Sequence, residues 1–273
     1  MSSILVCGRF EVDLDKPRIM AIINVTPDSF SGPGYLSRDA ALRAAEQAVA
    51  EGADFLDIGG ESSRPGAQSV SEQEELDRVL PVVEALVPLG IPISVDTVKP
   101  VVMRESIATG ADMINDIAAF RTPGALEAVK DGKVALCVMH MQGEPGTMQV
   151  SPSYGDVVQD VRSFLDQRIG VLRKAGVSAE RIVADPGFGF GKTLAHNVAL
   201  LKALALLRDD GFPLLVGMSR KTMLGEISGR PVGDRLAIGA AAALVAVQNG
   251  ARIVRTHDVG ATRDVLRLWD QIR

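Results

Sequence analysis

The sequence has few cysteines, no excess of positive charge and no long apolar run, and each shortage excludes a class of protein. Its two cysteines, Cys7 and Cys137, lie far apart in 273 residues. This spacing fits neither a metal site nor a disulfide framework and favours a reduced, cytoplasmic protein. The net charge of −5 provides no basic surface for nucleic acid. Because no apolar run reaches the ~20 residues of a membrane span and no signal-peptide pattern opens the chain, we expect no membrane partner either.

Eight short apolar segments, each followed by a helical pattern, define the organisation of the chain. A hydrophobic content of 47% is enough for one large α/β domain or two small ones. The predicted strands lie at residues 20–25, 55–58, 91–95, 113–114, 134–139, 182–184, 213–218 and 253–254. Continuous apolar strands fit a parallel sheet that is buried on both faces. We therefore predict one (β/α)8 TIM barrel domain over residues 1–273, with residues 1–18 as a short N-terminal extension, and an open doubly wound sheet as the second choice.

The stretch 181–192, RIVADPGFGFGK, is typical of a strand that delivers one acid to a loop. The strand ends at Asp185, because Pro186 cannot continue a sheet ladder and three alternating glycines follow it. A phosphate-binding P-loop is excluded because Pro186 stands where its first glycine is needed. A dinucleotide fingerprint is excluded because Lys192 replaces its third glycine. The alternative interpretation is a flexible turn after a structural aspartate.

Polar residues end each predicted strand. In a barrel, the carboxyl ends of the strands meet on one face, where active sites are built. A single aspartate at such an end is more often a helix cap, but a full ring of polar ends favours a functional site. The ring consists of Asn24, Asp57, Asp96, Asn115, His140, Asp185, the 219–222 group and His257.

The polar residues of this face separate into two sets. Acceptors and one amide, which suit a heterocycle that presents N–H and amino donors beside a carbonyl, come from Asp96, Asn115 and Asp185. Cations and donors, which suit a phosphorylated or anionic substrate, come from Arg64, Arg220, Lys221, Arg255 and His257. The alternatives are a surface arginine with a hydrogen-bonded histidine at 255 and 257, and a solvated turn at 219–222. Thr222 could also open a short helix.

A series of ordered motifs covers nearly the whole chain. They are NVTPDSF at 24–30, GGESSRPGA at 59–67, SVDT at 94–97, NDI at 115–117, MHMQGEP at 139–145, DPGFGFGK at 185–192, SRK at 219–221 and RTHD at 255–258. With these motifs, the chain from residue 19 to the end resembles the bacterial dihydropteroate synthases of the folate pathway. The resemblance implies a transferase in which 4-aminobenzoate displaces diphosphate from 6-hydroxymethyl-7,8-dihydropterin diphosphate in an SN1-like reaction, giving 7,8-dihydropteroate.

The resemblance also implies roles for individual residues. The pterin would be bound by Asp96, Asn115, Met139, Asp185, Lys221 and Arg255. The 4-aminobenzoate pocket would be formed by Phe30, Ser63, Arg64, Pro65, Phe188, Gly189, Lys221 and Thr222. The diphosphate would contact Asn24, Arg64, Arg255 and His257, with Asn24 also binding Mg²⁺. The residues expected to take part in catalysis are Asp96, Asn115, Asp185, Lys221, Arg255 and His257. The resemblance further implies a homodimer that sulfonamides inhibit by mimicking 4-aminobenzoate.

One departure from the family pattern lies in the first loop. The family commonly has an aspartate directly after the SFS sequence, whereas here Gly32-Pro33-Gly34 follows Ser31. Without that carboxylate, Mg²⁺ would be held mainly by the diphosphate, Asn24 and water. Two other functions stay open at this point. A methyltetrahydrofolate-type methyltransferase would have no use for the ESSRPGA, SRK and RTH motifs, and a non-catalytic pterin-binding paralogue would be expected to lack Arg64 or Lys221.

Overall fold

Eight parallel strands close into a barrel. The computed structural model describes residues 3–25, 34–62, 69–208 and 211–272. The strands are β3 (Arg18–Asn24), β4 (Phe55–Gly59), β5 (Ile93–Asp96), β6 (Met113–Asp116), β7 (Ala135–Met139), β8 (Ile182–Asp185), β9 (Leu215–Val216) and β10 (Ile253–Thr256). Each pairs in parallel with its neighbour in the order β8-β7-β6-β5-β4-β3-β10-β9. A parallel bridge between Ala184 and Leu214 joins the two ends of this order, so the predicted barrel is confirmed and an open sheet is excluded.

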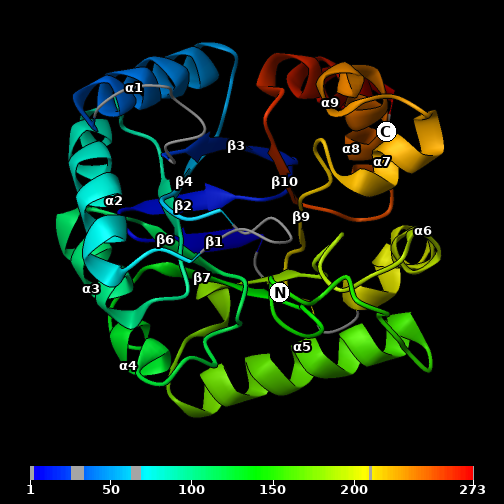
Figure 1. Ribbon diagram of the computed structural model, residues 1–273, viewed down its shortest axis with the longest axis horizontal. Helices are drawn as coiled ribbons and strands as arrows, with labels where there is room; N and C mark the ends of the chain where they lie inside the picture. Colours follow the sequence, from blue (N-terminus) through cyan, green and yellow to red (C-terminus); the bar gives the residue numbers. More distant parts are fainter. Residues whose placement is uncertain (1–2, 26–33, 63–68, 209–210, 273) are drawn as a thin grey trace.

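The helices form a ring around the strands (Figure 1). They are α1 (Gly34–Ala50), α2 (Glu72–Leu86), α3 (Pro100–Thr109), α4 (Ala125–Val129), α5 (Val157–Lys174), α6 (Leu194–Lys202), α7 (Thr222–Ser228), α8 (Leu236–Gln248) and α9 (Val259–Ile272). Local signals place several of their ends. The Ser71 side chain caps α2 by accepting from Glu74 N, and α3 begins at Pro100 and ends before Gly110. No helix in the described ranges is long and apolar enough to cross a membrane.

One strand is shorter than the sequence predicts. The segment 213–218 was expected to be extended throughout, but β9 contains only two residues. Pro213 has no N–H to give to a sheet, and after Val216 the chain turns, with Lys221 N donating to Met218 O at 3.1 Å. This early turn brings Lys221 back over the end of the barrel.

Side chains alternate between the two faces of the barrel wall. One face packs against the helices, as Ile19, Ala21 and Ile23 of β3 do. The other face points into the barrel. Its lower layers, which lie nearer the amino ends of the strands, are apolar. Their members include Met20, Phe55, Met113, Ala135, Cys137, Val183, Leu215 and Ile253. Four of the next inward positions toward the carboxyl ends are polar, namely Asp57, Asn115, Asp185 and Arg255, so the interior changes from an apolar core to a largely polar site along the barrel axis.

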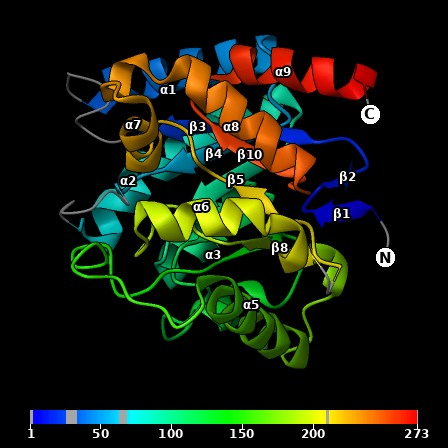
Figure 2. The ribbon, with the colours of Figure 1, turned by 90° about the vertical axis from the view of Figure 1, so that its right-hand side faces the viewer.

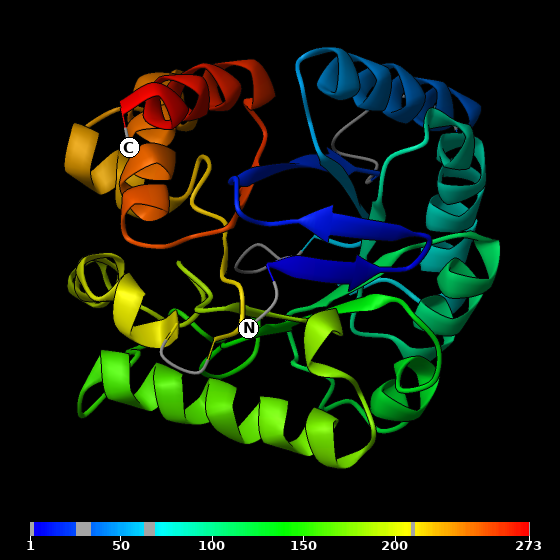
Figure 3. The same ribbon diagram turned by 180° about the vertical axis from the view of Figure 1, so that it is seen from behind.

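An N-terminal hairpin closes the lower end of the barrel. Strands β1 (Ile4–Cys7) and β2 (Phe10–Asp13) pair antiparallel and lie across the barrel opening (Figure 3). In the side view they lie at one end of the barrel (Figure 2). Leu5, Cys7 and Leu14 pack into the lower interior cluster. The segment was expected only as an extension; it is a plug that shields the lower core from water.

A buried carboxylate fixes the plug. Asp112, 1% exposed, accepts hydrogen bonds from Arg9 Nη2 at 2.7 Å, Arg9 Nε at 2.9 Å and Arg9 N at 3.1 Å. It also accepts from Ile93 N at 3.1 Å, which ties the hairpin to β5. Gly8 has a φ of +58°, and a Cβ there would lie 2.4 Å from Asp112 Oδ1. The glycine is therefore required by both the turn and the close approach of the carboxylate.

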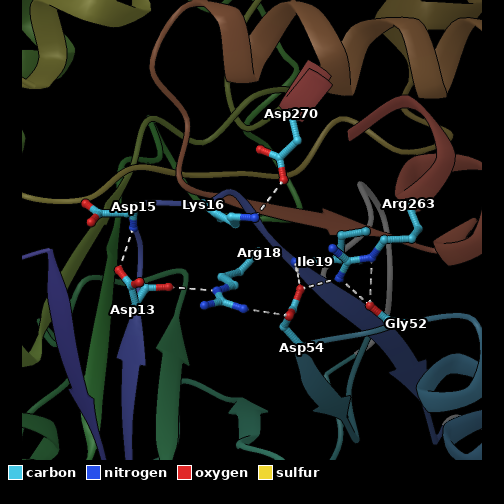
Figure 4. Close-up of polar contacts among 9 residues, drawn as sticks. All are labelled: Asp13, Asp15, Lys16, Arg18, Ile19, Gly52, Asp54, Arg263 and Asp270. Carbon is cyan, nitrogen blue, oxygen red and sulfur yellow. Dashed lines mark hydrogen bonds and ion pairs between the residues drawn. The ribbon is translucent and has the colours of Figure 1, made fainter. Parts of the chain in front are cut away.

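A second network joins the hairpin, β3 and the last helix (Figure 4). The Asp54 carboxylate accepts from Ile19 N at 2.8 Å, from Arg18 Nη1 at 3.2 Å and from Arg263 Nη2 at 2.5 Å. Arg263 also donates to Gly52 O. These contacts lie at the N-terminal end of the barrel, where polar residues serve stability and not catalysis.

Removing the carboxylate that holds the plug should destabilise the fold. Asp112→Ala leaves Ile93 N without its partner, which costs about 1–3 kcal/mol, whereas the largely exposed Arg9 guanidinium can be solvated by water. We expect a fall of that size in the free energy of unfolding, measured by urea denaturation. The exposed Asp39→Ala variant serves as control and should stay within about 0.5 kcal/mol of the wild type. Equal stability of the two variants would show that the plug does not depend on Asp112.

Candidate active site

The guanidinium of Arg255 lies inside the upper barrel between two carboxylates. Arg255 Nε donates to Asp57 Oδ2 at 2.6 Å, and Nη2 donates to Asp96 Oδ2 at 2.9 Å. The three residues come from β10, β4 and β5, so the contacts cross the barrel interior. Although burial alone would lower the pKa of Arg255, Asp57 and Asp96 raise it, and the group stays charged. One side chain thereby connects three walls of the site.

Asp57 has the most central position in this arrangement. It is fully buried, and its Oδ2 atom also accepts from Asn115 Nδ2 at 3.3 Å. Asp57 Oδ1, Asn115 Oδ1 and Ser94 Oγ are among the buried side-chain atoms of the described residues that have no hydrogen-bond partner; others, such as Glu75 Oε1 and Ser106 Oγ, lie on helices α2 and α3. A buried polar atom without a partner costs about 1–3 kcal/mol, so three of them at one place indicate that a polar ligand completes the site.

Asp96 titrates close to neutral pH. Burial raises its pKa to about 7, with Arg255 opposing that shift and Asp57 adding to it. Two carboxylates and one guanidinium therefore share a small buried volume. The excess of acceptors in this volume suits a ligand edge that carries several N–H donors.

Asp185 occupies the opposite wall, at the end of β8. Its Oδ1 atom accepts from Gly187 N at 2.7 Å, so the turn that follows the strand orients the carboxylate. Burial raises the pKa of Asp185, and Lys221 opposes that shift. The sequence thus predicted correctly that this acid lies at a strand end, facing the interior with Asp96 and Asn115.

Lys221 reaches this wall from the loop after β9. Its Nζ atom donates to Phe188 O at 2.5 Å and lies 4.6 Å from the centroid of the Phe190 ring. Burial lowers the pKa of Lys221 to about 8, while Asp185 opposes the shift. Lys221 is therefore a cation whose charge changes near physiological pH.

An apolar wall borders the polar residues. Met139 at the end of β7 is 3% exposed and forms a small cluster with Ile117, Met141 and Met148, against which Phe190 packs. Flexible methionines and one aromatic ring form a surface suited to a flat heterocycle. The site therefore combines a polar rim with one apolar side.

Other predicted site residues lie at the same end of the barrel. His257 Nδ1 is 3.0 Å from Ser219 Oγ, which holds the imidazole beside the loop after β9. Asn24 ends β3 in register with Gly59 of β4. Gly189 has a φ of +78° and lies close to the Lys221 side chain, because a Cβ there would be 3.1 Å from Lys221 Cδ. Thr222 is exposed and begins α7, as one of the alternatives expected.

Two expectations about orientation are wrong. His140 was placed in the polar ring, but its ring packs edge-on against Phe164 of α5 at 4.9 Å, outside the barrel. It follows the inward-facing Met139, and successive side chains point to opposite faces of a strand. Phe188 was expected to shape a substrate pocket, but its ring is fully buried in the core beneath the helices. Only its carbonyl oxygen meets the site, through Lys221.

Four predicted residues, Phe30, Ser63, Arg64 and Pro65, lie outside the described residues, as do Gly32 and Pro33 of the first loop. Conversely, Asp57 belongs to the site although the residue roles inferred from the motifs omit it. Its signal was present in the sequence. Asp57 lies two residues after the inward-facing Phe55, so the period of two places its carboxylate inside the barrel.

The described residues offer little to a metal ion by themselves. They contain no cluster of three or more histidine, cysteine or acidic side chains with metal-site geometry. Asn24 supplies one amide oxygen at the mouth of the barrel. Mg²⁺ commonly keeps several waters and binds through substrate phosphates, so this donor set fits a Mg²⁺ ion carried by a diphosphate and not one held by the protein alone.

Comparison with known proteins agrees with this geometry. Residues 20–257 match the family of pterin binding enzymes. The dihydropteroate synthase of Neisseria meningitidis serogroup B is 50% identical, covering 97% of this chain and 96% of that relative. The Burkholderia cenocepacia dihydropteroate synthase, solved with 7,8-dihydropteroate, is 56% identical with a TM-score of 0.92, covering 100% and 97% of the two chains. The Xanthomonas albilineans synthase, solved with 4-aminobenzoic acid, is 49% identical with a TM-score of 0.94, covering 100% and 98%.

The barrel and its polar upper interior thus place the chain among the pterin-binding enzymes. Within that class, the chain belongs to the dihydropteroate synthases, transferases of folate biosynthesis. The methyltransferase and the non-catalytic paralogue are not favoured, since the curated and solved relatives over the full length are dihydropteroate synthases.

The lowered pKa of Lys221 predicts a pH dependence. Lys221 is charged below a pH of about 8 and neutral above it, so kcat/KM for the pterin substrate should fall as the pH rises through that value. Lys221→Arg keeps the charge to much higher pH and should move this alkaline limb upward, even if the maximal rate is lower. The substrate has the same pKa values with the wild type and with Lys221→Arg, so its titration does not shift the limb between them. An alkaline limb at the same pH in both would assign it to another group.

Proposed function

We propose that the upper interior of the barrel binds the dihydropterin ring of 6-hydroxymethyl-7,8-dihydropterin diphosphate. The observation that carries this proposal is the set of buried polar atoms without partners on β4, β5 and β6, Asp57 Oδ1, Ser94 Oγ and Asn115 Oδ1, with the Asp185 carboxylate on the opposite wall. A pterin presents an amino group and ring N–H donors on one edge and a carbonyl oxygen nearby. Carboxylates and an amide accept from the donors, and Lys221 donates to the carbonyl oxygen.

The remaining pterin contacts follow from the walls of the site. Met139 lies against one side of the ring. Arg255, held by Asp57 and Asp96, presents the face of its guanidinium, which stacks well on flat conjugated rings. Because the two carboxylates fix this arginine before any ligand binds, its orientation adds little entropic cost on binding.

The reaction is a displacement at the pterin methylene. Diphosphate leaves most easily when cations stabilise the charge that develops on it, and Arg255 and His257 lie at the same end of the barrel as Asn24. The ring nitrogens of the dihydropterin delocalise the resulting methylene cation, so bond breaking precedes attack by the arylamine in an SN1-like reaction. No protein nucleophile is required, and Asp96, Asn115 and Asp185 act by holding and polarising the ring.

The second substrate is 4-aminobenzoate. Its carboxylate would be bound next to Thr222, at the beginning of α7, and its amine would approach the pterin methylene past Gly189 and Lys221. Arg64, Ser63, Pro65 and Phe30 complete this pocket in the proposal. The X. albilineans synthase solved with 4-aminobenzoic acid and the Yersinia pestis synthase solved with a sulfonamide support this substrate and this class of inhibitor.

The residue that would hold Mg²⁺ is Asn24. Asn24, together with diphosphate oxygens and water, would hold the ion, and the ion would neutralise charge on the leaving group. The chain contributes Arg255 and His257 as fixed cationic or donor groups, so part of the neutralisation is independent of the metal.

A homodimer is part of the proposal, because helix α8 carries an exposed apolar stripe. The stripe has no charged residue and includes Leu236, Ala237, Ala241 and Val245. Exposed Leu268 and Ile272 lie on α9, next to it (Figure 2). An apolar surface of this kind is typical of an interface, and a homodimer would cover it. Val245→Glu should convert a dimer into a monomer in sedimentation equilibrium; a wild-type monomer would refute the homodimer.

A cytoplasmic location is supported by the thiols. Cys7 and Cys137 are both buried and free, and burial raises the pKa of both. Such thiols are unreactive and are compatible with a reducing compartment.

The assignment of the pterin site is tested with Asp185. In Asp185→Asn one charged acceptor is lost, which costs about 1–3 kcal/mol of binding, so the pterin Kd should rise about five- to hundredfold in calorimetry. Dihydropteroate formation from the two substrates should fall in parallel. The matched control is Asp116→Asn. Asp116 is also a fully buried carboxylate at a strand end, but it accepts from Ala118 N and Phe120 N of its own loop.

Asp116→Asn should therefore lower thermal stability and leave the pterin Kd unchanged. An unaltered Kd in Asp185→Asn would show that the pterin does not bind at this acid. Absence of dihydropteroate formation by the wild-type protein would contradict the proposed reaction itself.

A further inference from the structure

Lys192, the last residue of the glycine-rich stretch after β8, is a buried cation for which the proposed reaction has no role. It is 3% exposed. Its Nζ atom lies 2.9 Å from Gly187 O, 3.0 Å from Phe190 O and 2.9 Å from His140 Nδ1, and 3.4 Å from His140 O. These acceptors are backbone carbonyls and one imidazole. The ammonium group thus sits at the centre of the turn and satisfies oxygens that the turn directs inward.

The turn needs such a central donor because of its backbone geometry. Gly187, Gly189 and Gly191 all have positive φ values, of +68°, +78° and +62°. This alternation points carbonyl groups into the protein, where an unpaired oxygen is costly. The turn also lies directly on the end of β7, since a Cβ at Gly187 would be 1.9 Å from His140 O. Lys192 provides the donors that allow this tight approach.

Other side chains hold the outer side of the same turn. Asn197 of α6 accepts from Gly189 N at 2.8 Å and donates to Thr193 O at 2.8 Å. The Tyr154 hydroxyl donates to Gly191 O at 2.7 Å. Lys192 is distinguished from them because it connects the turn to β7, the neighbouring strand of the barrel wall.

The inner side of the turn carries groups that orient the proposed pterin contacts. Gly187 N donates to Asp185 Oδ1, and Phe188 O accepts from Lys221 Nζ. The Phe190 ring lies under the same ammonium group of Lys221. A shift of the turn would therefore move an anionic and a cationic group of the site together.

We propose that Lys192 is a positioning residue for the reaction: by tying Gly187 O and Phe190 O to His140, it fixes the turn that orients Asp185 and Lys221. The inference rests on the proposed pterin contacts of Asp185 and Lys221. Lys192 touches no substrate in this account. It acts only through the turn and through its charge.

The charge of Lys192 acts on the same acid that the turn orients. It lowers the pKa of Asp185, opposing the effect of burial. The pKa of His140 is lowered to about 3, first by burial and then by Lys192, so this imidazole is neutral and its Nδ1 atom accepts. Burial lowers the pKa of Lys192 to about 7, with Asp185 opposing and Lys221 adding to the shift. The groups that face this cluster are His140, Asp185, Lys221, Tyr154, His196 and Arg121.

The test compares Lys192→Met with Lys202→Met, which removes an exposed lysine of the adjacent helix α6. Misplacement of binding groups by about 1 Å can cost up to about a hundredfold, so kcat/KM for the pterin substrate should fall about ten- to hundredfold in Lys192→Met at a temperature well below its Tm. The pterin Kd should rise with it. Lys202→Met should leave both unchanged.

A second readout separates positioning from a structural role. Without the charge of Lys192, Asp185 should be protonated at a higher pH than in the wild type. The acid limb of the kcat/KM profile should therefore move to higher pH. This limb is measured below a pH of about 7, where Lys192 is charged in the wild type. Lys192→Arg keeps a charge and several donors and should restore the wild-type limb at least in part. A purely structural lysine would lower Tm without moving this limb.

If Lys192→Met does not fold, Tyr154→Phe removes a different hydrogen bond from the same turn. It should raise the pterin Kd severalfold without changing a charge. The inference is overturned if a folded Lys192→Met, or failing that Tyr154→Phe, binds pterin and turns over as the wild type does. Asp185→Asn measured alongside identifies the source of failure. If Asp185→Asn also leaves pterin binding unchanged, the pterin site itself is wrongly placed. If Asp185→Asn loses pterin binding while Lys192→Met binds and turns over as the wild type does, only the role of Lys192 is refuted.

Discussion

The arrangement of the upper barrel depends on one buried guanidinium held between two carboxylates. Arg255 contacts Asp57 and Asp96 on strands that are not its neighbours, so it fixes three walls of the site relative to one another. Removing one partner of such a buried pair typically costs about 3–5 kcal/mol, because the other charge stays buried without compensation. The contact therefore serves the stability of the barrel and, in the proposed function, the orientation of a group that meets the pterin.

The cost of these buried charges is offset at the other end of the barrel. The lower interior is filled by apolar side chains such as Phe55 and Met113, and the N-terminal hairpin closes it from below. Asp112 and Asp54 hold that closure with hydrogen bonds to backbone and arginine donors. A well-packed apolar lower half allows the upper half to keep polar atoms without partners, which we propose the substrate supplies. This division is the general one for barrels of this class, with stability at one end and chemistry at the other.

Much of this could be predicted from the sequence, and each failure has a physical cause. The strands were found because apolar runs alternate with helical patterns, and Asp96, Asn115 and Asp185 were placed correctly at their ends. What the strand ends alone do not give is the direction of each side chain. His140 and Asp116 directly follow the inward-facing Met139 and Asn115, and both point outward, where Asp116 caps its own loop. The hairpin was missed because two four-residue strands without a helix carry little periodicity. The placement of Lys192 depends on contacts between β7 and the turn, which no local pattern encodes.

In the proposed function, Arg255 binds the pterin in the orientation set by its carboxylate partners. A double-mutant cycle with Asp57→Asn, Arg255→Gln and the double variant, read as the free energy of pterin binding by calorimetry, measures this most directly. Residues in contact that act through one ligand typically show coupling of about 0.5–3 kcal/mol. We expect a coupling of at least about 1 kcal/mol, because the part of the Asp57 effect that is exerted through the guanidinium disappears when Arg255 is replaced. Additive effects of the two substitutions, with coupling near zero, would contradict it.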